Sequence, residues 1–510
     1  MIFPDFAEFS SLTDQGNFIP VYQEFVADLE TPVSAWYKVC ADQPHSFLLE
    51  SVEGGERLGR YSFLGCDPVW VLEARGHQCK KTHRQGKVEV FTGNPFDILS
   101  SCLESINPVH LPQLPADIGG LFGYWGYELI SWIEPKVTVY PPNEGGLPDG
   151  IWMQVDNLLI FDQVKRKIWA IAYADLRQKH LSLEEIYQKA CDQVTKLVLK
   201  LQLPLPISAK PLEFNVSANK NAPNFTNYRS NTTEEEFSAS VAKAQEYIKA
   251  GDIFQVVLSQ KLQASYHGHP FELYRSLRLI NPSPYMAFYN FDGWQLIGSS
   301  PEVMVKAEKQ EDGTTKATLR PIAGTRPRGK NAEEDQFFAQ DLLQDPKEIA
   351  EHVMLVDLGR NDLGRVCVKG SVTVDELMVI ERYSHVMHIV SNVTGVLESQ
   401  YTPWDLLKAA FPAGTVSGAP KIRAMQIINE LEPERRGPYS GVYGYYNFDG
   451  QLNTAITIRT MIAQKVKGAD SYVISVQAGA GVVADSQAQK EYQETLNKAR
   501  GLLEAIGGLS

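Results

Sequence analysis

A chain of 510 residues is too long for one ordinary hydrophobic core and predicts two large lobes or one elaborated domain. Hydrophobic residues make up 44% of it and charged residues 21%, as in water-soluble globular proteins, and the net charge of −13 argues against a nucleic-acid-binding surface. The sequence shows no signal peptide, no run of roughly 18 apolar residues that could span a membrane, and no CxxC pair among six cysteines. We therefore expect a cytoplasmic protein with reduced thiols, without nucleic-acid or membrane partners.

Residues 1–203 form the first predicted unit. Short β-like runs such as GRYSFLG and KIWAIAYAD dominate it, and the helical segment LSLEEIYQKACDQVTKLVLKLQ closes it. Residues 204–227 are rich in Pro, Asn and Ser without apolar periodicity, which predicts a linker. The second unit, residues 228–510, begins with a helix that Thr232 or Thr233 can cap and that Gly251 follows.

Two Asp-Gly dipeptides in the second unit predict β-hairpins. They separate the β-rich runs of YMAFYNF-DG-WQLIGSS and of VYGYYNF-DG-QLNTAITIRT. The pentapeptide YNFDG occurs in both, at 289–293 and 446–450, which is compatible with two similar sheets. We expect an α+β fold with two packed antiparallel sheets, helices outside, and the amino-terminal unit interleaved with the second.

Two predicted helices, far apart in the sequence, each present a pair of glutamates on one face. The spacing of three residues places both members of a pair on the same side, in Glu348 with Glu351 and in Glu491 with Glu494. If these faces meet, they offer the carboxylate oxygens that Mg²⁺ prefers. The alternative is that these glutamates only stabilise their helices. Glu348 would then complete the helix cap that Asp345 begins, and Glu494 would form a salt bridge with Lys498.

Two glycine-rich segments could receive an anion. QAGAGVVADS carries Gly479, Ala480 and Gly481, whose small side chains allow close backbone approach, although a tight turn explains them equally. FPAGTVSGAPKIRAM presents Thr415 and Lys421 before a helix, without a Walker motif.

A strand arginine and a histidine complete the set of candidate site residues. Arg459 is predicted to lie in the strand TAITIRTMI, on the face of Ala455 and Thr457, as a surface charge or a carboxylate clamp. His388 lies in an apolar strand-like run, where a core histidine is the alternative. Together these residues indicate a magnesium-dependent enzyme that acts on a small organic acid.

From about residue 233 to 506 the sequence resembles the chorismate-utilising enzymes. The matching stretches include GDIFQVVLSQ, IGSSPEVMV, RPIAGTRPRG, AEHVMLVDLGRNDLGRV, AFPAGTVSGAPKIRAM, AITIRT and QAGAGVVADS. In the first unit, LLESVEGGERLGRYSFLG is similar to the amino-terminal domain of anthranilate synthase component I.

Two positions distinguish branches of this family. Gln255 stands where isochorismate- and salicylate-forming relatives carry a water-activating lysine, and an amide cannot act as a general base. Ala323 stands where aminodeoxychorismate synthases have a candidate nucleophilic lysine. The resemblance thus implies a magnesium-dependent lyase that uses ammonia to form anthranilate. The alternatives are an aminodeoxychorismate synthase component I and a non-catalytic tryptophan-sensing module.

The resemblance also implies residue roles. Glu302 would be the general acid, with His388 and Thr415 also in catalysis. Glu351 and Glu494 would bind Mg²⁺, with Glu348 and Glu491 nearby. The residues expected to bind chorismate are Gly324, Thr325, Lys421, Tyr439, Arg459, Gly479, Ala480 and Gly481.

Partners and regulation follow from the same resemblance. No cysteine lies in the G-x-C-x-G context of class I glutamine amidotransferases, so a separate amidotransferase subunit (component II) is implied, in a heterotetramer. L-tryptophan would inhibit by binding between the units. Its site would include Ser51, Pro284, Tyr285 and Met286.

Overall fold

The computed structural model describes residues 1–52, 59–115, 118–140, 146–212, 228–383 and 386–507. Most of the predicted linker, residues 213–227, lies outside the described residues. Among the described residues, no helix is long and apolar enough to cross a membrane.

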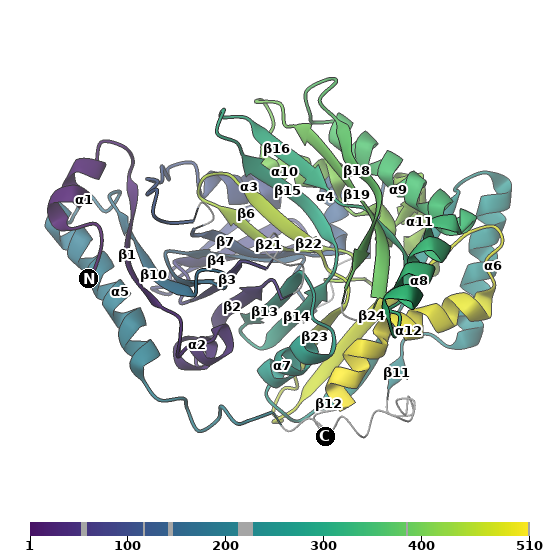
Figure 1. Ribbon diagram of the computed structural model, residues 1–510, viewed down its shortest axis with the longest axis horizontal. Coiled ribbons are helices and arrows are strands. Elements are labelled where there is room, and N and C mark those ends of the chain that lie inside the picture. The colour runs from purple at the N-terminus through teal and green to yellow at the C-terminus, as the bar shows by residue number, and fades with distance from the viewer. Residues whose placement is uncertain (53–58, 116–117, 141–145, 213–227, 384–385, 508–510) are drawn as a thin grey trace.

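The described strands form two large antiparallel sheets (Figure 1). The first sheet has the order β1 (Phe18–Val26), β10 (Lys167–Asp175), β9 (Asn157–Asp162), β3 (Tyr61–Cys66), β2 (His45–Glu50), β13 (Tyr285–Phe291), β14 (Trp294–Ser300), β23 (Thr460–Lys465), β24 (Tyr472–Val482), β12 (Gln255–Tyr266) and β11 (Arg229–Ser230), with β20 (Gly418–Ala419) beside β12. The second has the order β17 (Ile322–Pro327), β19 (Val386–Val396), β16 (Thr315–Leu319), β15 (Val303–Lys309), β22 (Leu452–Ile456), β21 (Val442–Asn447), β7 (Gly120–Trp125), β8 (Gly150–Val155), β4 (Trp70–Arg75), β5 (Gln78–His83) and β6 (Val88–Thr92), with β18 (Thr373–Arg382) beside β19.

Helices cover the outer faces of the sheets. They are α1 (Phe6–Leu12), α2 (Pro32–Val39), α3 (Pro95–Ser101), α4 (Ile130–Ile133), α5 (Leu183–Gln202), α6 (Glu234–Ala250), α7 (Pro270–Ile280), α8 (Ala332–Gln344), α9 (Pro346–Gly364), α10 (Pro403–Ala410), α11 (Lys421–Leu431) and α12 (Ala488–Gly507). In Figure 1, α5 and α12 lie at opposite ends of the first sheet, where α5 packs on β10 and β1 and α12 on β24. The expected α+β fold is confirmed.

Both predicted units contribute strands to both sheets. Strand β2 pairs with β13 in the first sheet, and β7 pairs with β21 in the second. Aromatic side chains join the inner faces of the sheets: the ring of Phe47 on β2 stacks on Phe122 of β7, with 4.0 Å between the ring centres. The amino-terminal unit is therefore interleaved with the second one rather than attached to it.

Local signals in the sequence explain several of these elements. Thr233 caps α6 in a capping box with Glu236, and Gly251 ends this helix with a φ of 83°, which glycine adopts without strain. The β13–β14 hairpin has the tight turn expected of Asp-Gly. In the β21–β22 hairpin the loop is wider, because the side chain of Asn447 accepts hydrogen bonds from the backbone of the loop and holds it open.

The chain passes between the sheets through short crossovers. We call residues 300–303 (β14 to β15) and 456–460 (β22 to β23) the carboxy-terminal crossovers. Residues 66–70 (β3 to β4) and 155–157 (β8 to β9) are the amino-terminal crossovers. Within each pair the two crossovers run side by side, because the strands on both sides of them are paired.

Candidate active site

The carboxy-terminal crossovers carry the two side chains with the strongest candidate chemistry, Glu302 and Arg459. The carbonyl of Glu302 accepts a hydrogen bond from the backbone N–H of Ile456 at 3.0 Å. The carbonyl of Arg459 accepts one from Ser299 N–H, also at 3.0 Å. These bonds tie each crossover to the strands of the other, so Glu302 and Arg459 are held at the boundary between the two sheets.

Glu302 is a buried carboxylic acid. Its side chain accepts a hydrogen bond from the hydroxyl of Thr415 at 3.0 Å. Burial raises its pKa to about 8, although the Thr415 bond and the charge of Lys498 act in the opposite direction. A carboxyl group that stays protonated at neutral pH can donate a proton to a leaving group. Thr415, predicted to act in catalysis, lies in the short helical turn Gly414–Val416 and is a direct partner of this acid.

Arg459 does not lie in a strand, and this prediction was wrong. Strand β22 ends at Ile456, and β23 starts only at Thr460. Between them Arg459 has a φ of 49°, a left-handed conformation that is uncommon for a side chain of this kind. Its guanidinium donates a hydrogen bond to the carbonyl of Lys498 at 2.6 Å. Burial lowers its pKa, while Tyr439 and Glu494 favour its charged form, so these groups gather around one point.

His388 approaches the same region from β19. Its Nδ1 lies 2.7 Å from the carbonyl oxygen of Gly324 and 3.2 Å from the hydroxyl of Thr325. A carbonyl only accepts hydrogen bonds, so Nδ1 carries the proton and Nε2 remains an acceptor. Burial lowers the pKa of His388, and the charge of Arg459 acts in the same direction. The ring is therefore neutral at physiological pH.

Gly324 connects this histidine to α9. Its φ is 67°, and a Cβ built there would lie 2.8 Å from Leu342 and 3.0 Å from a carboxylate oxygen of Glu348. Only glycine fits this conformation without displacing those side chains. The structure thus brings Gly324, Thr325, His388 and Glu348 together, as the resemblance implied.

The segment of Gly479, Ala480 and Gly481 is the end of strand β24, not the loop that the sequence suggested. It pairs with β12 in register from Ser259 to Val257, whereas the pairing of β24 with β23 ends at Val476, so β23 does not cover the other edge of this segment. The absence of side chains serves another purpose. A Cβ at Gly479 would lie 2.7 Å from the hydroxyl of Tyr439, and one at Gly481 would lie 2.5 Å from the Gln255 amide. The glycines leave room for these two polar groups.

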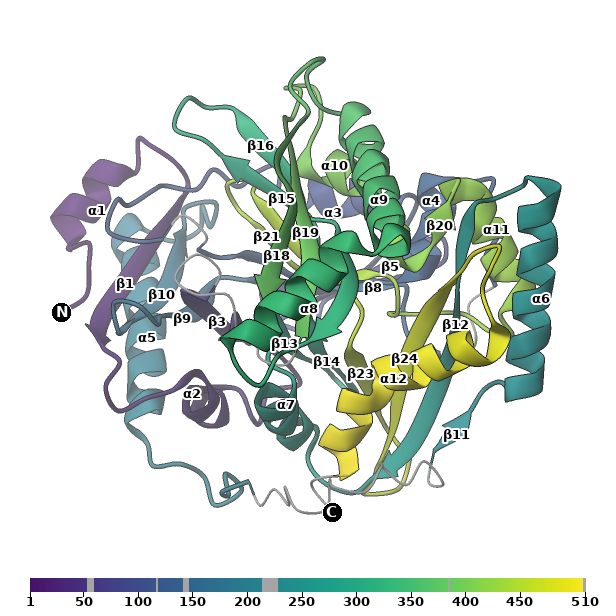
Figure 2. The ribbon, with the colours of Figure 1, turned by 45° about the vertical axis from the view of Figure 1, so that its right-hand side comes forward.

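The carboxylates of α9 and α12 face the same region. The amide of Gln255 donates to Glu351 at 3.3 Å, and Lys498 pairs with Glu494 at 2.7 Å. As predicted, Asp345 caps α9. The helices α8, α9 and α12 lie on the right in Figure 1 and come to the front together in Figure 2.

Electrostatics support the approach of the two helices. Burial raises the pKa of Glu348, and the neighbouring charge of Glu351 adds to this. Burial also raises the pKa of Glu491, with Glu494 adding to it and Lys347 on α9 opposing it. No group of three or more His, Cys, Asp or Glu side chains is assembled around a metal position in the described part of the chain. The donors fit magnesium in kind, since Mg²⁺ needs only one or two carboxylates beside water and substrate oxygens.

Lys421 does not join this group. Its ammonium forms an ion pair with Asp362 at 2.8 Å and donates to the carbonyl of Ala410 at 2.7 Å. Burial lowers the pKa of Lys421, with Asp362 opposing the shift. Both bonds hold the start of α11 against α9, so the structure gives this lysine a stabilising contact in place of the predicted contact with substrate. Lys498, considered from sequence only as a salt-bridge partner, is instead the central cation, and it also donates to the carbonyl of Gly479 at 3.0 Å.

The four residues expected to bind tryptophan line one cavity of about 350 Å³ between β2, β13 and β21. The hydroxyl of Ser51 is buried there and has no hydrogen-bond partner among the described residues. Residues outside the predicted set also line the cavity, among them Glu50, Arg60, Lys306, Tyr443, Tyr445 and Asn453. Their contribution could not be seen from spacing, since the wall joins six separate segments of the chain.

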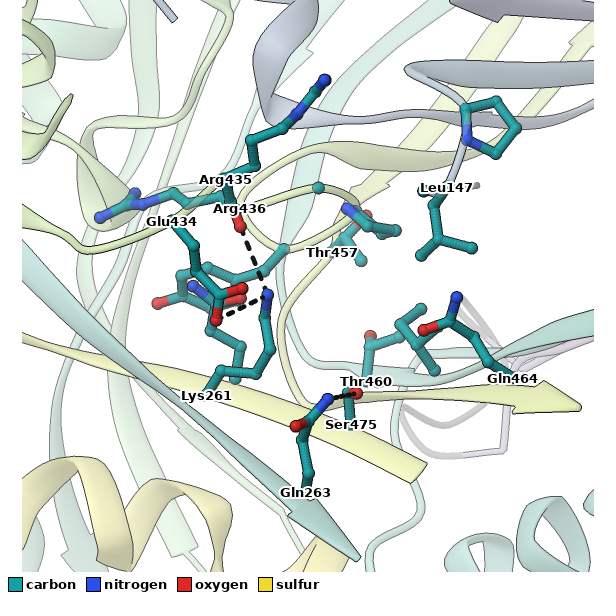
Figure 3. Close-up of a pocket in the computed structure, with 17 residues that line it drawn as sticks. Leu147, Lys261, Gln263, Glu434, Arg435, Arg436, Thr457, Thr460, Gln464 and Ser475 are labelled. Atoms are coloured by element: carbon teal, nitrogen blue, oxygen red, sulfur yellow. Dashed lines mark hydrogen bonds and ion pairs between the residues drawn. The ribbon is translucent and has the colours of Figure 1, made fainter. Parts of the chain in front are cut away.

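A different cavity, of about 230 Å³, has Tyr439 among its lining residues (Figure 3). Its cations are already paired: Lys261 with Glu434 at 3.2 Å, Arg436 with Glu432 at 2.6 Å, and Arg435 with Asp149. Gln263 bonds to Ser475 at 3.2 Å across its floor. With its charges neutralised, this cavity suits a dicarboxylic substrate less well than the region around Glu302 and Arg459.

Comparison with known proteins agrees with this geometry. Residues 45–504 match the family model described as chorismate binding enzyme. Anthranilate synthase component 1 of Synechocystis sp. is 71% identical over 510 residues, which cover 100% of both chains. That of Acetivibrio thermocellus is 45% identical, with 99% of each chain covered. The crystal structure of anthranilate synthase component I from Streptococcus pneumoniae superposes with a TM-score of 0.74 at 36% identity, covering 94% of this chain and 99% of that one. The menaquinone-specific isochorismate synthase of Escherichia coli shares the fold, with a TM-score of 0.68 at 17% identity over 98% of this chain and 99% of its own.

Proposed function

This chain belongs to the family of chorismate-binding enzymes and its full-length relatives are named anthranilate synthase component 1, so we propose that it converts chorismate and ammonia to anthranilate, pyruvate and water. The observation that carries the proposal is Glu302, a buried acid that accepts a hydrogen bond from Thr415 and whose pKa of about 8 keeps it protonated. Ammonia adds to the ring, and the ring hydroxyl leaves as water with the proton of Glu302. Loss of a ring proton and of the enolpyruvyl group then gives the aromatic product.

The two positions that distinguish branches of the family favour ammonia as the nucleophile. Gln255 presents a neutral amide that donates to Glu351, and such a group cannot activate water. Ala323, on β17, pairs with Ile389 and offers no nucleophile. The attacking atom therefore has to come from outside the chain.

Substrate carboxylates have suitable partners at the boundary between the sheets. Arg459 and Tyr439 interact electrostatically with each other, and this guanidinium and phenol can hold the enolpyruvyl carboxylate. Neutral His388 lies within range of the charge of Arg459, and its Nε2 can accept a proton or orient the ring during loss of pyruvate. Gly324 and Thr325 would line the ring pocket between them.

We also propose magnesium as the cofactor. Glu351 and Glu494 would hold it, with Glu348 and Glu491 close by. When bound, the ion would neutralise the ring carboxylate of chorismate and favour attack at the neighbouring carbon. The raised pKa values of Glu348 and Glu491 support this assignment, because a cation would relieve the like-charge contacts within each pair.

A glutamine amidotransferase subunit is the proposed source of ammonia in the cell. All six cysteines are described, and five of them are buried, in sequence contexts that lack a nucleophile elbow. Tryptophan is the proposed feedback inhibitor, since Ser51, Pro284, Tyr285 and Met286 line one cavity of suitable size. The hydroxyl of Ser51, which has no partner within the described part of the chain, is available to bind its ammonium or carboxylate group.

One experiment tests the reaction. The purified chain is incubated with chorismate, magnesium and ammonium, and the product is identified by chromatography and fluorescence, with and without tryptophan. We expect anthranilate and pyruvate in equal amounts, loss of product when magnesium is chelated, and inhibition by tryptophan. Formation of 4-amino-4-deoxychorismate would contradict the proposed reaction, and the absence of turnover would favour a sensing protein that has kept the fold.

A further inference from the structure

Tyr443 links the two sheets through its hydroxyl. It lies on β21 of the second sheet and is only 2% exposed. Its hydroxyl donates to the carbonyl of Tyr285 at 2.7 Å and accepts from the N–H of Ser300 at 3.1 Å. Tyr285 and Ser300 are cross-strand partners at the open end of the β13–β14 hairpin in the first sheet. One side chain of the second sheet therefore holds the last rung of a hairpin in the first.

One side of this link is the cavity proposed for tryptophan. Tyr443 and Tyr285 both line that cavity, together with Met286 of β13 and Pro284, which precedes this strand. A ligand in the cavity would rest against the strand whose first carbonyl accepts the hydrogen bond of Tyr443. The Tyr443 hydroxyl is thus bonded directly to the strand that forms one wall of the cavity.

The other side of the link is the proposed general acid. Glu302 follows Ser300 by two residues, and the intervening Pro301 restricts the backbone between them. The hydroxyl of Ser300 is shared with the backbone of Glu302, 3.4 Å from its N–H and 3.3 Å from its carbonyl. Any shift of the Ser300 backbone is thus passed to the residue that bears the buried acid.

The link has little freedom to adjust. A Cβ built on Gly298 would lie 2.7 Å from the Tyr443 hydroxyl, so this glycine is what makes room for it. Burial raises the pKa of Tyr443 well above its usual value, which keeps the hydroxyl protonated throughout the working pH range. Tyr443 can therefore act as a donor to Tyr285 in every state of the enzyme.

We propose that Tyr443 is a positioning residue that couples occupation of the cavity by an aromatic amino acid to the placement of Glu302. A ligand that holds β13 in a new position would draw the Tyr443 hydroxyl away from Ser300, and the acid would lose its alignment with the ring hydroxyl of chorismate. This inference rests on the proposed function, and it assigns the route by which the feedback inhibitor acts on catalysis.

The test compares Tyr443→Phe with Tyr445→Phe, which removes a hydroxyl from another tyrosine of the same cavity. Calorimetry measures tryptophan binding, and rates with ammonium give kcat and KM for chorismate with and without saturating tryptophan. In Tyr443→Phe we expect tryptophan to bind, while the factor by which it lowers kcat/KM falls about fivefold or more. The alkaline limb of the pH profile should also move, because the surroundings of Glu302 change. Tyr445→Phe should keep the wild-type factor within about twofold.

Gly298→Ala provides a second variant that displaces the hydroxyl without changing the tyrosine. It should reproduce the reduced inhibition. Full inhibition by saturating tryptophan in both variants, with an unshifted pH profile, would overturn the coupling while leaving the proposed reaction intact. A wild-type chain that forms anthranilate but binds no tryptophan would overturn the feedback proposal and the coupling together. Absence of anthranilate from the wild-type chain would overturn the proposed function itself.

Discussion

The amino-terminal and carboxy-terminal crossovers occupy equivalent places in two halves of the fold. Counted outward from the β2–β13 contact, the first sheet reads β2, β3, β9, β10 in one direction and β13, β14, β23, β24 in the other. The second sheet reads β7, β8, β4, β5 and β21, β22, β15, β16 from the β7–β21 contact. Helices α5 and α12 cover equivalent strands at the two ends. Each half thus has the same pair of adjacent crossovers between the same pair of sheets.

The two pairs of crossovers are stabilised in different ways. In the amino-terminal pair the guanidinium of Arg84 joins both segments, through the carbonyl of Asp67 and the carboxylate of Asp156 at 2.7 Å. In the carboxy-terminal pair the side chains do not join the two segments. The carboxyl group of Glu302 bonds to Thr415, and the guanidinium of Arg459 bonds to the carbonyl of Lys498 on α12. The same topology can therefore be closed by an ion pair or equipped with polar groups for a substrate, and the residues at the crossovers decide which.

The largest expected effect is on kcat, and it should distinguish a substitution of Glu302 in the carboxy-terminal crossovers from a matched substitution in the amino-terminal crossovers. Glu302→Gln keeps the shape and the Thr415 contact but removes the transferable proton, so kcat should fall about 100-fold or more. Asp156→Asn, the matched change in the amino-terminal pair, should leave kcat within about twofold. Initial rates with chorismate and ammonium measure both. A Glu302→Gln variant within tenfold of the wild-type rate would contradict the role of general acid.

Arg459 should give the next largest effect. A lysine cannot reproduce the planar set of donors of a guanidinium, so Arg459→Lys is expected to lower kcat/KM about 10- to 100-fold, mainly through KM. Arg84→Lys serves as the control in the other half. Steady-state kinetics over a range of chorismate concentrations distinguish the two, and an equal response of both variants would show that the crossovers do not differ in function.

The sequence predicted the parts of this comparison that depend on local chemistry. Thr233 and Gly251 delimit α6 as expected, and Asp345 caps α9, because caps depend on residues within one turn of the chain. The Asp-Gly hairpin at 292–293 formed for the same reason. The resemblance to a known family named Glu302 and Thr415 together, which spacing alone did not do, and the two side chains are hydrogen-bonded.

What the sequence could not predict depends on where the chain changes sheet. Alternation within TAITIRTMI suggested one continuous strand, but hydrophobic period carries no sign of a crossover, so the position of Arg459 was missed. The shared YNFDG segments belong to hairpins of different sheets and are not equivalent in the duplicated topology. The prediction of the residues around Ser51 was incomplete, because Arg60 and Tyr443 reach this cavity only through tertiary packing.

A smaller effect concerns folding stability, because the buried carboxyl group of Glu302 makes the free energy of unfolding depend on pH. Burial raises the pKa of Glu302 to about 8 in the folded chain, against 4.5 for an unperturbed glutamate. Between these pH values the folded chain retains a proton that the unfolded chain releases. The contribution of Glu302 to stability is therefore complete below 4.5 and is lost as the pH rises through 8. Glu302→Gln has no proton to release in this range, so its stability should not fall in the same way as the pH rises.

Thermal unfolding at several pH values tests this. The Tm of Glu302→Gln relative to wild type should be about 2–4 °C higher at pH ~8.5 than at pH ~5, without substrate or metal. Thr415→Val is a useful companion, because it removes the hydrogen bond that favours the charged form and should steepen the dependence on pH. A constant difference between Glu302→Gln and wild type would show that the acid is not buried as described.

The smallest effect is expected in the amino-terminal crossovers, where a substitution should lower stability and leave activity unchanged. Arg84→Gln removes the ion pair with Asp156 and should lower the unfolding free energy by about 1 kcal/mol, because the arginine side chain is 26% exposed and solvent screens the pair. Rates of anthranilate formation should not change. Chemical unfolding of Arg84→Gln, Asp156→Asn and the double variant would measure the coupling between the two residues. A loss of activity without a loss of stability would mean that these crossovers also serve catalysis, and that the division of roles between the halves is wrong.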